Sequence, residues 1–273
     1  MISEIKRDID YKFAVFQIFG LLLLFGTSVG YVDYSGKGIS IIQLLLDIRE
    51  GNYISNGSIN GFELWCKGIS TYASVMYPIL TCLGFSISIY YEKLGARRTR
   101  LIREKRLRYC FEKVTGAVVS SGVLFMISYM VFGIMVQIRI LSSFPSTSIN
   151  RNDVISCVVR LSYSFIYGMA LSLFIIVISV FFDDKYELVC LPILVKYMVL
   201  IISNRIGIMG ARSNGNVFFR HISEVMMNPE NLISNYSSLR EKTESFIVAF
   251  VFFIMSIVVM NYKIKRDEKN GNI

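Results

Sequence analysis

Six stretches of this chain almost entirely lack charge. Each is 17 to 25 residues long, and Lys196 in the fifth is the only charged residue among them. About 20 apolar residues match the roughly 30 Å hydrocarbon core of a bilayer, where only helices and closed barrels satisfy their backbone groups. The sequence therefore predicts an all-α fold, a single transmembrane domain over 1–273 with six spans. The predicted spans are 13–32, 68–91, 114–138, 161–182, 188–204 and 245–262.

Residues that support metal or redox chemistry are also scarce. The chain has one histidine, His221, and its five cysteines form no C-x-x-C pair. We therefore predict no metal site. The six stretches contain no Asp, Glu or His, which disfavours both an intramembrane enzyme and a transporter driven by an ion gradient, because each needs such groups within the membrane.

Positive charge is present in excess, at a formal net charge of +9, and it is unevenly placed. Four segments outside the spans hold 17 of the 29 lysines and arginines in 50 positions: 1–12, 92–113, 183–187 and 263–273. The other three, 33–67, 139–160 and 205–244, hold 11 in 97 positions. The positive-inside rule places the first set in the cytoplasm. Both termini are then cytoplasmic.

Two of the predicted external loops contain apolar segments of their own. Residues 39–48 are apolar but too few to cross a bilayer, so we expect an amphipathic helix lying against the outer leaflet. The loop 205–244 has helix-like apolar spacing between Val217 and Met226 before the breaker Asn228-Pro229. This segment is expected to dip back toward the membrane.

The segment between the second and third spans is the most basic part of the chain. Residues 93–113 hold nine basic and two acidic side chains. Within it Leu107, Cys110, Phe111 and Val114 follow the i, i+3, i+4, i+7 spacing of an amphipathic helix. Such a helix at the cytoplasmic surface either fixes topology by contact with anionic headgroups or docks a cytoplasmic partner. Nucleic-acid binding is disfavoured, because base-stacking aromatics and a DNA-binding motif are missing.

Three residues within the predicted spans are candidates for a translocation pathway. A charge at the middle of a span costs at least about 2.5 kcal/mol, so Lys196 is expected either to face a polar pathway or to pair with a neighbouring helix. Pro78 and Pro192 are expected to break spans two and five, each within a Pro-Ile-Leu triplet. Paired interrupted helices in two inverted halves are typical of a transport path. Tolerated prolines are the alternative.

The order of these segments resembles that of permease subunits of the ABC type-2 exporter family, in the compact six-helix form of Gram-positive bacteria. That family has a short amphipathic cytoplasmic N-terminus, matched by Met1–Lys12, and an external helix after span one. Its second cytoplasmic loop is a short polar turn before a proline-containing fifth span, and its last helix follows a long external loop. Its second span ends in a Glu followed by Gly and basic residues, matched here by Glu92, Gly95, Arg97, Arg98 and Arg100.

The resemblance implies an ATP-driven transporter in which a separate cytoplasmic ABC ATPase subunit binds ATP and Mg²⁺. The partners it implies are that ATPase, a second permease chain of the same or another sequence, and membrane lipids. The 93–113 helix would be the coupling helix, and the 183–187 turn a second contact. The implied coupling residues are Glu92, Gly95, Arg97, Arg98, Arg100, Arg103, Asp183, Asp184 and Lys185.

The sequence itself also favours the interpretation that this chain binds no ATP. A P-loop requires G-x-x-x-x-G-K-[ST], and Gly36-Lys37-Gly38 lacks the final Ser or Thr and lies in a predicted external loop. We therefore expect no cofactor on this chain and no enzymatic activity of its own. The family exports peptides, lipids and hydrophobic small molecules. A membrane protein that binds a peptide without transporting it, as a sensor or immunity protein, is the alternative.

Overall fold

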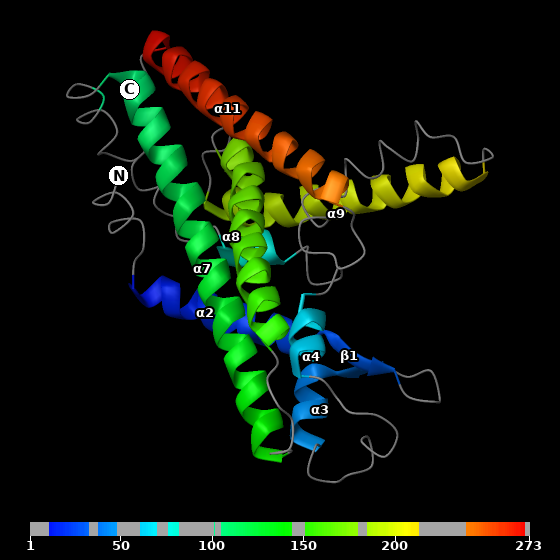
Figure 1. The fold of residues 1–273 in the computed structure, drawn as a ribbon. Coiled ribbons are helices and arrows are strands. Elements are labelled where there is room, and N and C mark those ends of the chain that lie inside the picture. The colour runs from blue at the N-terminus through cyan, green and yellow to red at the C-terminus, as the bar shows by residue number, and fades with distance from the viewer. Residues whose placement is uncertain are drawn as a thin grey trace.

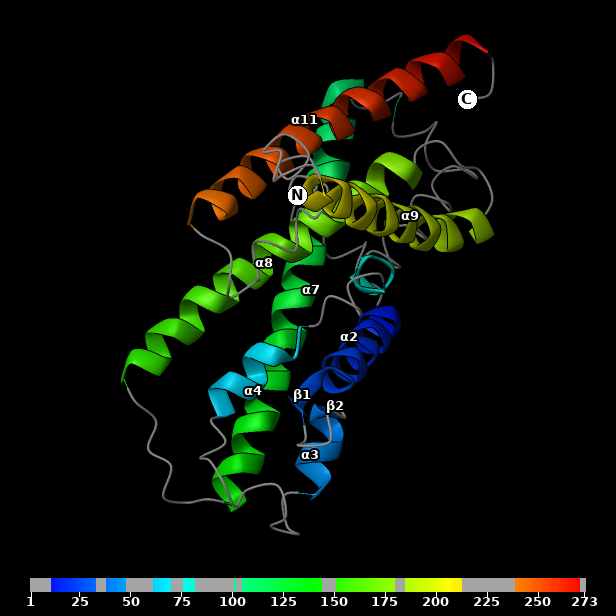
Figure 2. The ribbon, with the colours of Figure 1, turned by 90° about the vertical axis from the view of Figure 1, so that its right-hand side faces the viewer.

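The computed structural model of the chain is built mainly of helices. It describes residues 11–32, 38–47, 61–69, 76–81, 101, 105–143, 151–179, 185–212 and 239–270. Its centre is a pair of helices of opposite direction, α7 (Arg106–Ser143) and α8 (Arg151–Ser179), which pack against each other toward the end of α8 and separate toward its start (Figures 1 and 2). They contain the third and fourth predicted spans.

Small residues set the distance between α7 and α8. A Cβ atom added to Gly168 would lie 3.0 Å from the Gly122 Cα and 2.8 Å from the Phe125 Cβ. Such approach of two backbones is typical of helix packing in membranes, where small residues replace the hydrophobic driving force. Phe125 and Tyr167 then meet edge-to-face, with ring centroids 5.1 Å apart. The fixed pairing of Gly122 with Gly168 therefore sets which residues face one another along the whole pair.

The last helix, α11 (Leu239–Lys269), crosses one end of this pair (Figure 1). There Met260 and Ile264 are buried with residues of the first turns of α7 and the last turns of α8. The α7 and α8 members of this cluster are Tyr109, Cys110, Val114, Ala117, Val118, Leu173 and Ile176. The C-terminal end of α11 and the N-terminal end of α7 therefore lie together, as expected of two segments on the same side of a membrane.

The first helix is shorter than the sequence predicts. α2 covers Tyr11–Gly26, and the remainder of the predicted span 13–32 turns into strand β1 (Val29–Val32), paired antiparallel with β2 (Gly38–Ser40). The turn is held by side chains, since Thr27 Oγ1 donates to the Leu24 carbonyl at 2.9 Å and Ser28 Oγ donates to the Gly68 carbonyl at 2.7 Å. These hydroxyls compete with the helical ladder, which explains why an uncharged stretch does not stay helical.

A cap of short elements covers the opposite end of α7 (Figure 2). It consists of the two strands with α3 (Ile41–Asp47) and α4 (Gly61–Lys67). The expected external helix 39–48 is thus present, in a shorter form. Two of its apolar residues, Ile41 and Leu44, are buried in the core that also contains Val136 and Ile140 of α7, whereas Leu46 is exposed. Arg139 Nε donates to the Leu45 carbonyl at 3.0 Å.

The fifth predicted span, 188–204, lies within a longer helix. α9 covers Lys185–Arg212. Residues 205–212, which were predicted to belong to the loop 205–244, are therefore helical. No proline or polar cluster interrupts 205–212, which explains why the helix continues. α9 lies across α7 in both views rather than along it (Figures 1 and 2). An aligned bundle of six helices is therefore not what the described residues form.

Three helices of the described residues are long and apolar enough to cross a membrane, namely α7, α8 and α11. They contain predicted spans three, four and six. Predicted span one is represented by the shorter apolar helix that ends at Gly26, and of span two only 68–69 and 76–81 lie within the described residues. The apolar segment 217–226 and the N-terminal 1–10 lie outside them.

The close contact between Gly122 and Gly168 predicts that two glycine-to-alanine substitutions differ in their effect on the free energy of unfolding. Gly168→Ala places a methyl group against the backbone of α7 and should lower the free energy of unfolding by about 1–3 kcal/mol. Gly20→Ala meets only the flexible end of the Leu80 side chain, 3.0 Å away, and should be neutral or slightly stabilising. Unfolding in a detergent titration measures both. Equal effects of the two substitutions would contradict the close α7–α8 approach.

Candidate functional site

Most of the predicted coupling residues lie outside the described part of the chain. These are Glu92, Gly95, Arg97, Arg98, Arg100, Arg103, Asp183 and Asp184. Lys185 is described as the first residue of α9. The contacts predicted for these residues with a partner subunit therefore remain predictions.

The three predicted pathway residues are all helical. Pro78 is buried in the first turn of the helical residues 77–81, where a missing backbone donor costs little. Pro192 lies in the third turn of α9, which continues to Arg212, so the prediction that it breaks the helix is wrong. Only one hydrogen bond near the helix start is removed there, and the later turns keep theirs. Lys196 is buried on α9 at 6% exposure, as expected of a charge that faces protein.

The C-terminal part of the predicted coupling helix is continuous with the third span. Residues 106–113 are the first turns of α7, a single helix of 38 residues, rather than a separate helix at the membrane surface. Nothing in the sequence from Arg106 into Val114 ends a helix, since glycine and proline are absent until Gly116. A movement at this basic end is therefore carried directly into the α7–α8 pair.

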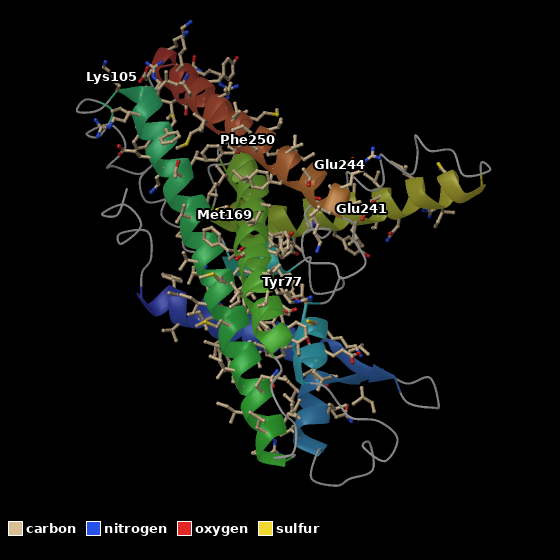
Figure 3. The ribbon with its side chains drawn as sticks, in the orientation of Figure 1. Tyr77, Lys105, Met169, Glu241, Glu244 and Phe250 are labelled. Atoms are coloured by element: carbon tan, nitrogen blue, oxygen red, sulfur yellow. The ribbon has the colours of Figure 1, made fainter. Side chains whose placement is uncertain are left out.

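An ion pair joins this end of α7 to the last turns of α11. The Arg106 guanidinium pairs with the Glu268 carboxylate across the two helices. Within α11 itself, Lys263 and Asp267 pair at 3.3 Å with both side chains about nine-tenths buried. Burial strengthens the attraction within such a pair, because water screens it less. We name residue 105, residues 106–113 of α7 and residues 263–269 of α11 the basic end (Figure 3, where Lys105 is labelled).

The predicted apolar side of this helix is divided between two environments. Cys110 and Val114 are fully buried against α8 and α11. Leu107 and Phe111 are 61% and 50% exposed, although Phe111 contacts the Phe253 ring with centroids 6.2 Å apart. Two of the four apolar positions of the predicted amphipathic helix are thus buried in the protein and two are exposed. The exposed half is an apolar patch among basic side chains, a composition that suits the surface of a protein partner.

A second cluster lies where α4 meets the central pair, and we name it the outer junction: Trp65, Cys66, Tyr129 and Arg160. Arg160 Nε donates to the Tyr129 hydroxyl at 2.7 Å and Nη2 donates to the Cys66 carbonyl at 2.8 Å. The Tyr129 hydroxyl donates to the Trp65 carbonyl at 3.1 Å, and Trp65 Nε1 donates to the Tyr129 carbonyl at 2.9 Å. The two rings stack at 4.8 Å. One arginine therefore joins α4, α7 and α8.

Aromatic rings continue the outer junction toward the centre of the molecule. The Phe25 ring, at the end of α2, contacts the rings of Tyr77, Phe125, Tyr129 and Phe132, with centroids between 5.5 and 5.6 Å apart. Tyr77 is fully buried and is labelled near the middle of Figure 3. Tilted and edge-to-face pairs of this kind each contribute about 0.5–1.5 kcal/mol beyond burial. The junction is therefore a packed, rigid structure.

Sequence reasoning did not identify Arg160 or the basic end's partners on α11. The available signal for Arg160 is its place directly before an uncharged stretch, next to Leu161. A charge at a span end is common, and its hydrogen bonds to α4 and α7 depend on residues 31 and 94 positions away. For Glu268 the partner is 162 positions away. Contacts this distant cannot be read from local patterns.

Because Cys66 is buried in the outer junction, we expect its thiol to react slowly with labelling reagents. Burial raises the pKa of Cys66 from 9.0 to about 11, although the Arg160 charge lowers it in part. Because the thiolate is the nucleophile, at pH 8 its fraction is about a hundredth of that of an unburied thiol. Maleimide labelling of a variant keeping only Cys66 should be at least about a hundredfold slower in folded than in SDS-unfolded protein. Labelling at equal rates would contradict the packing of α4 on α7.

Comparison with known proteins found no match among family models, curated proteins or solved structures. The function proposed below is accordingly argued from the residues of this chain.

Proposed function

We propose that this chain is the transmembrane permease subunit of an ATP-driven ABC exporter in a bacterial plasma membrane. A separate cytoplasmic ATPase subunit drives it, and a second permease chain completes the pathway. Its cargo is a peptide, a lipid or a hydrophobic small molecule. The six uncharged stretches, the basic segments between them and the order of these segments support the proposal.

One structural observation, at the start of α7, supports the proposal in addition to the sequence. Residues 106–113, the C-terminal part of the most basic segment, are the first turns of α7, and the exposed Leu107 and Phe111 lie on them. A partner bound to 93–111 would therefore hold the end of a helix of 38 residues, about 57 Å long at 1.5 Å per residue.

The mechanism follows from how α7 is connected. Movement of the docked ATPase tilts the basic end, and α11 follows because Arg106 and Glu268 pair across the two helices. The close Gly122–Gly168 contact makes α8 move with α7 as one body. A rigid pair that tilts against the remaining helices changes access to a pathway between inward and outward states, as in other hinge and shear transitions.

Lys196 and Pro192 are proposed to line that pathway from α9, with Pro78 on the second span. A buried lysine attracts an acidic group of a cargo, and its place on α9 is near the middle of the fifth uncharged stretch. Asp183, Asp184 and Lys185 are proposed as a second ATPase contact at the start of α9. Glu92, Gly95, Arg97, Arg98, Arg100 and Arg103 are proposed as the main one.

Co-purification tests the proposal. The tagged chain, solubilised gently from its native membranes, should bring down a soluble ABC ATPase near one-to-one by mass spectrometry. Arg97→Glu, Arg98→Glu and Arg100→Glu together should reduce that recovery by about tenfold or more, because each reversal adds repulsion at the interface. Leu107→Ser should reduce it as well, without a change in unfolding, since its side chain is exposed.

A variant of equal charge change is the control. This variant combines Arg205→Glu, Arg220→Glu and Arg240→Glu, at three positions in the predicted external segment 205–244. It should leave the recovery of the ATPase unchanged. If the control loses the ATPase equally, the docking site is wrong and overall charge is responsible. If no ATPase is recovered with the unaltered chain, a sensor or immunity role becomes the better account.

A further inference from the structure

Two of the five cysteines lie in segments that the charge pattern predicts to be external. Cys66 is in the segment 33–67 and Cys157 in the segment 139–160, whereas the other three lie in predicted spans or in the basic segment 93–113. Both are thiols in the structure. The outside of a cell is an oxidising environment, in which neighbouring thiols form disulfides. The two cysteines therefore form a site if the fold brings them together.

Cys66 faces the side of α4 on which α8 lies. In both ribbon views α4 lies between β1 and the first turns of α8 (Figures 1 and 2). Leu64 faces β1, because a Cβ atom added to Gly30 would lie 3.2 Å from Leu64 Cδ2. Residues two positions apart on a helix point in directions that differ by about 200°. The Cys66 side chain therefore points away from β1 and toward α8, and it is buried there.

Cys157 faces inward from the first turns of α8. The next residue, Val158, is exposed, whereas Cys157 is partly buried and packs against the core that contains Trp65. Arg160 lies three residues later and therefore on the same face of α8. Its Nη2 donates to the Cys66 carbonyl at 2.8 Å. The face of α8 that carries Cys157 is thus the face that contacts the end of α4.

The two thiols differ in how readily they react. Burial raises the pKa of the Cys66 thiol to about 11, and the charge of Cys157 adds to that rise. Cys157 is the less buried of the two. Because the thiolate is the nucleophile, an oxidant that reaches the outer side reacts first with Cys157.

We propose that Cys66 and Cys157 are an oxidisable pair, which forms a disulfide on the outer side of the membrane and ties the cap to α8. The oxidant is another disulfide. The Cys157 thiolate attacks one sulfur of that disulfide and releases the other sulfur as a thiolate. The Cys66 thiolate then attacks the Cys157 Sγ, which forms the new bond and releases the second thiolate. The two protons of the cysteines pass to the released thiolates, so one disulfide is reduced as the other forms.

The disulfide would make an existing connection covalent. Arg160 already links α8 to the end of α4 through a hydrogen bond. A bond between Cys66 and Cys157 closes the chain between them into a loop, which also constrains the unfolded state. A disulfide joins cysteines whose Cα atoms are about 4.4–6.8 Å apart, so its formation requires the close approach of α8 to α4. The proposal does not depend on the ATPase.

Thiol counting in the full-length chain tests this proposal. Right-side-out vesicles of native membranes are treated with oxidised glutathione, the chain is unfolded in SDS with N-ethylmaleimide, and its mass is measured. After oxidation three of the five cysteines should take up maleimide, and after dithiothreitol all five should. Digestion without a reductant should release one cross-linked pair of peptides, which contains Cys66 and Cys157.

Two variants distinguish this pair from the other cysteines. Cys157→Ser should leave Cys66 reduced, so that all four remaining cysteines take up maleimide after oxidation. Cys190→Ser removes an exposed cysteine of α9 and should still form the cross-link. The digest of the unaltered chain decides the matter even if a variant fails to fold.

Four results would overturn the proposal. The oxidised chain takes up maleimide at all five cysteines, or glutathione stays attached to Cys157 because Cys66 does not reach it. Cys157 cross-links two copies of the chain instead of two segments of one copy. The same Cys66–Cys157 pair forms equally well in SDS-unfolded protein, in which case the fold does not select it.

Discussion

The approach of α7 and α8 at Gly122 and Gly168 is the contact on which the rest of the structure depends. Because the backbones nearly touch there, the residues facing one another along the pair are fixed in both directions. Toward one end this aligns Tyr129 with Arg160, which then reaches the carbonyl of Cys66 and holds the cap. Toward the other it brings α7 and α8 together around Met260 and Ile264 of α11. A loss of register would disturb both ends at once.

The sequence predicts the helices better than it predicts their limits. Length and absence of charge are sufficient to identify α7, α8 and α11, since each needs only a continuous apolar stretch. The end of α2 at Gly26 was not predicted, because it depends on Ser28 bonding to a carbonyl 40 residues away. The transverse direction of α9 was not predicted either. Hydropathy indicates whether a segment partitions into lipid or water. It does not determine the angle at which a helix packs against neighbouring helices.

For the functional residues too, the sequence predicts some features and not others. The basic character of 93–113 and the charge of Lys196 within an apolar stretch follow from the sequence alone. Which of the apolar residues in 107–114 are buried does not. What the sequence does not contain is the partner of each charge. Arg106 meets Glu268, and Arg160 meets Tyr129, only because helices far apart in the chain pack together. Those partners determine whether a charge holds the fold together or stays available to a ligand.

The central claim is that a separate ATPase acts on this chain through the basic end. Its most direct test is ATP hydrolysis by that ATPase in lipid vesicles, measured with and without this chain. The account predicts that hydrolysis changes severalfold when the chain is present. It also predicts that Glu268→Gln, which breaks the link to Arg106 from the α11 side, keeps the ATPase bound but loses the change. Hydrolysis that is identical with and without the chain would contradict the account.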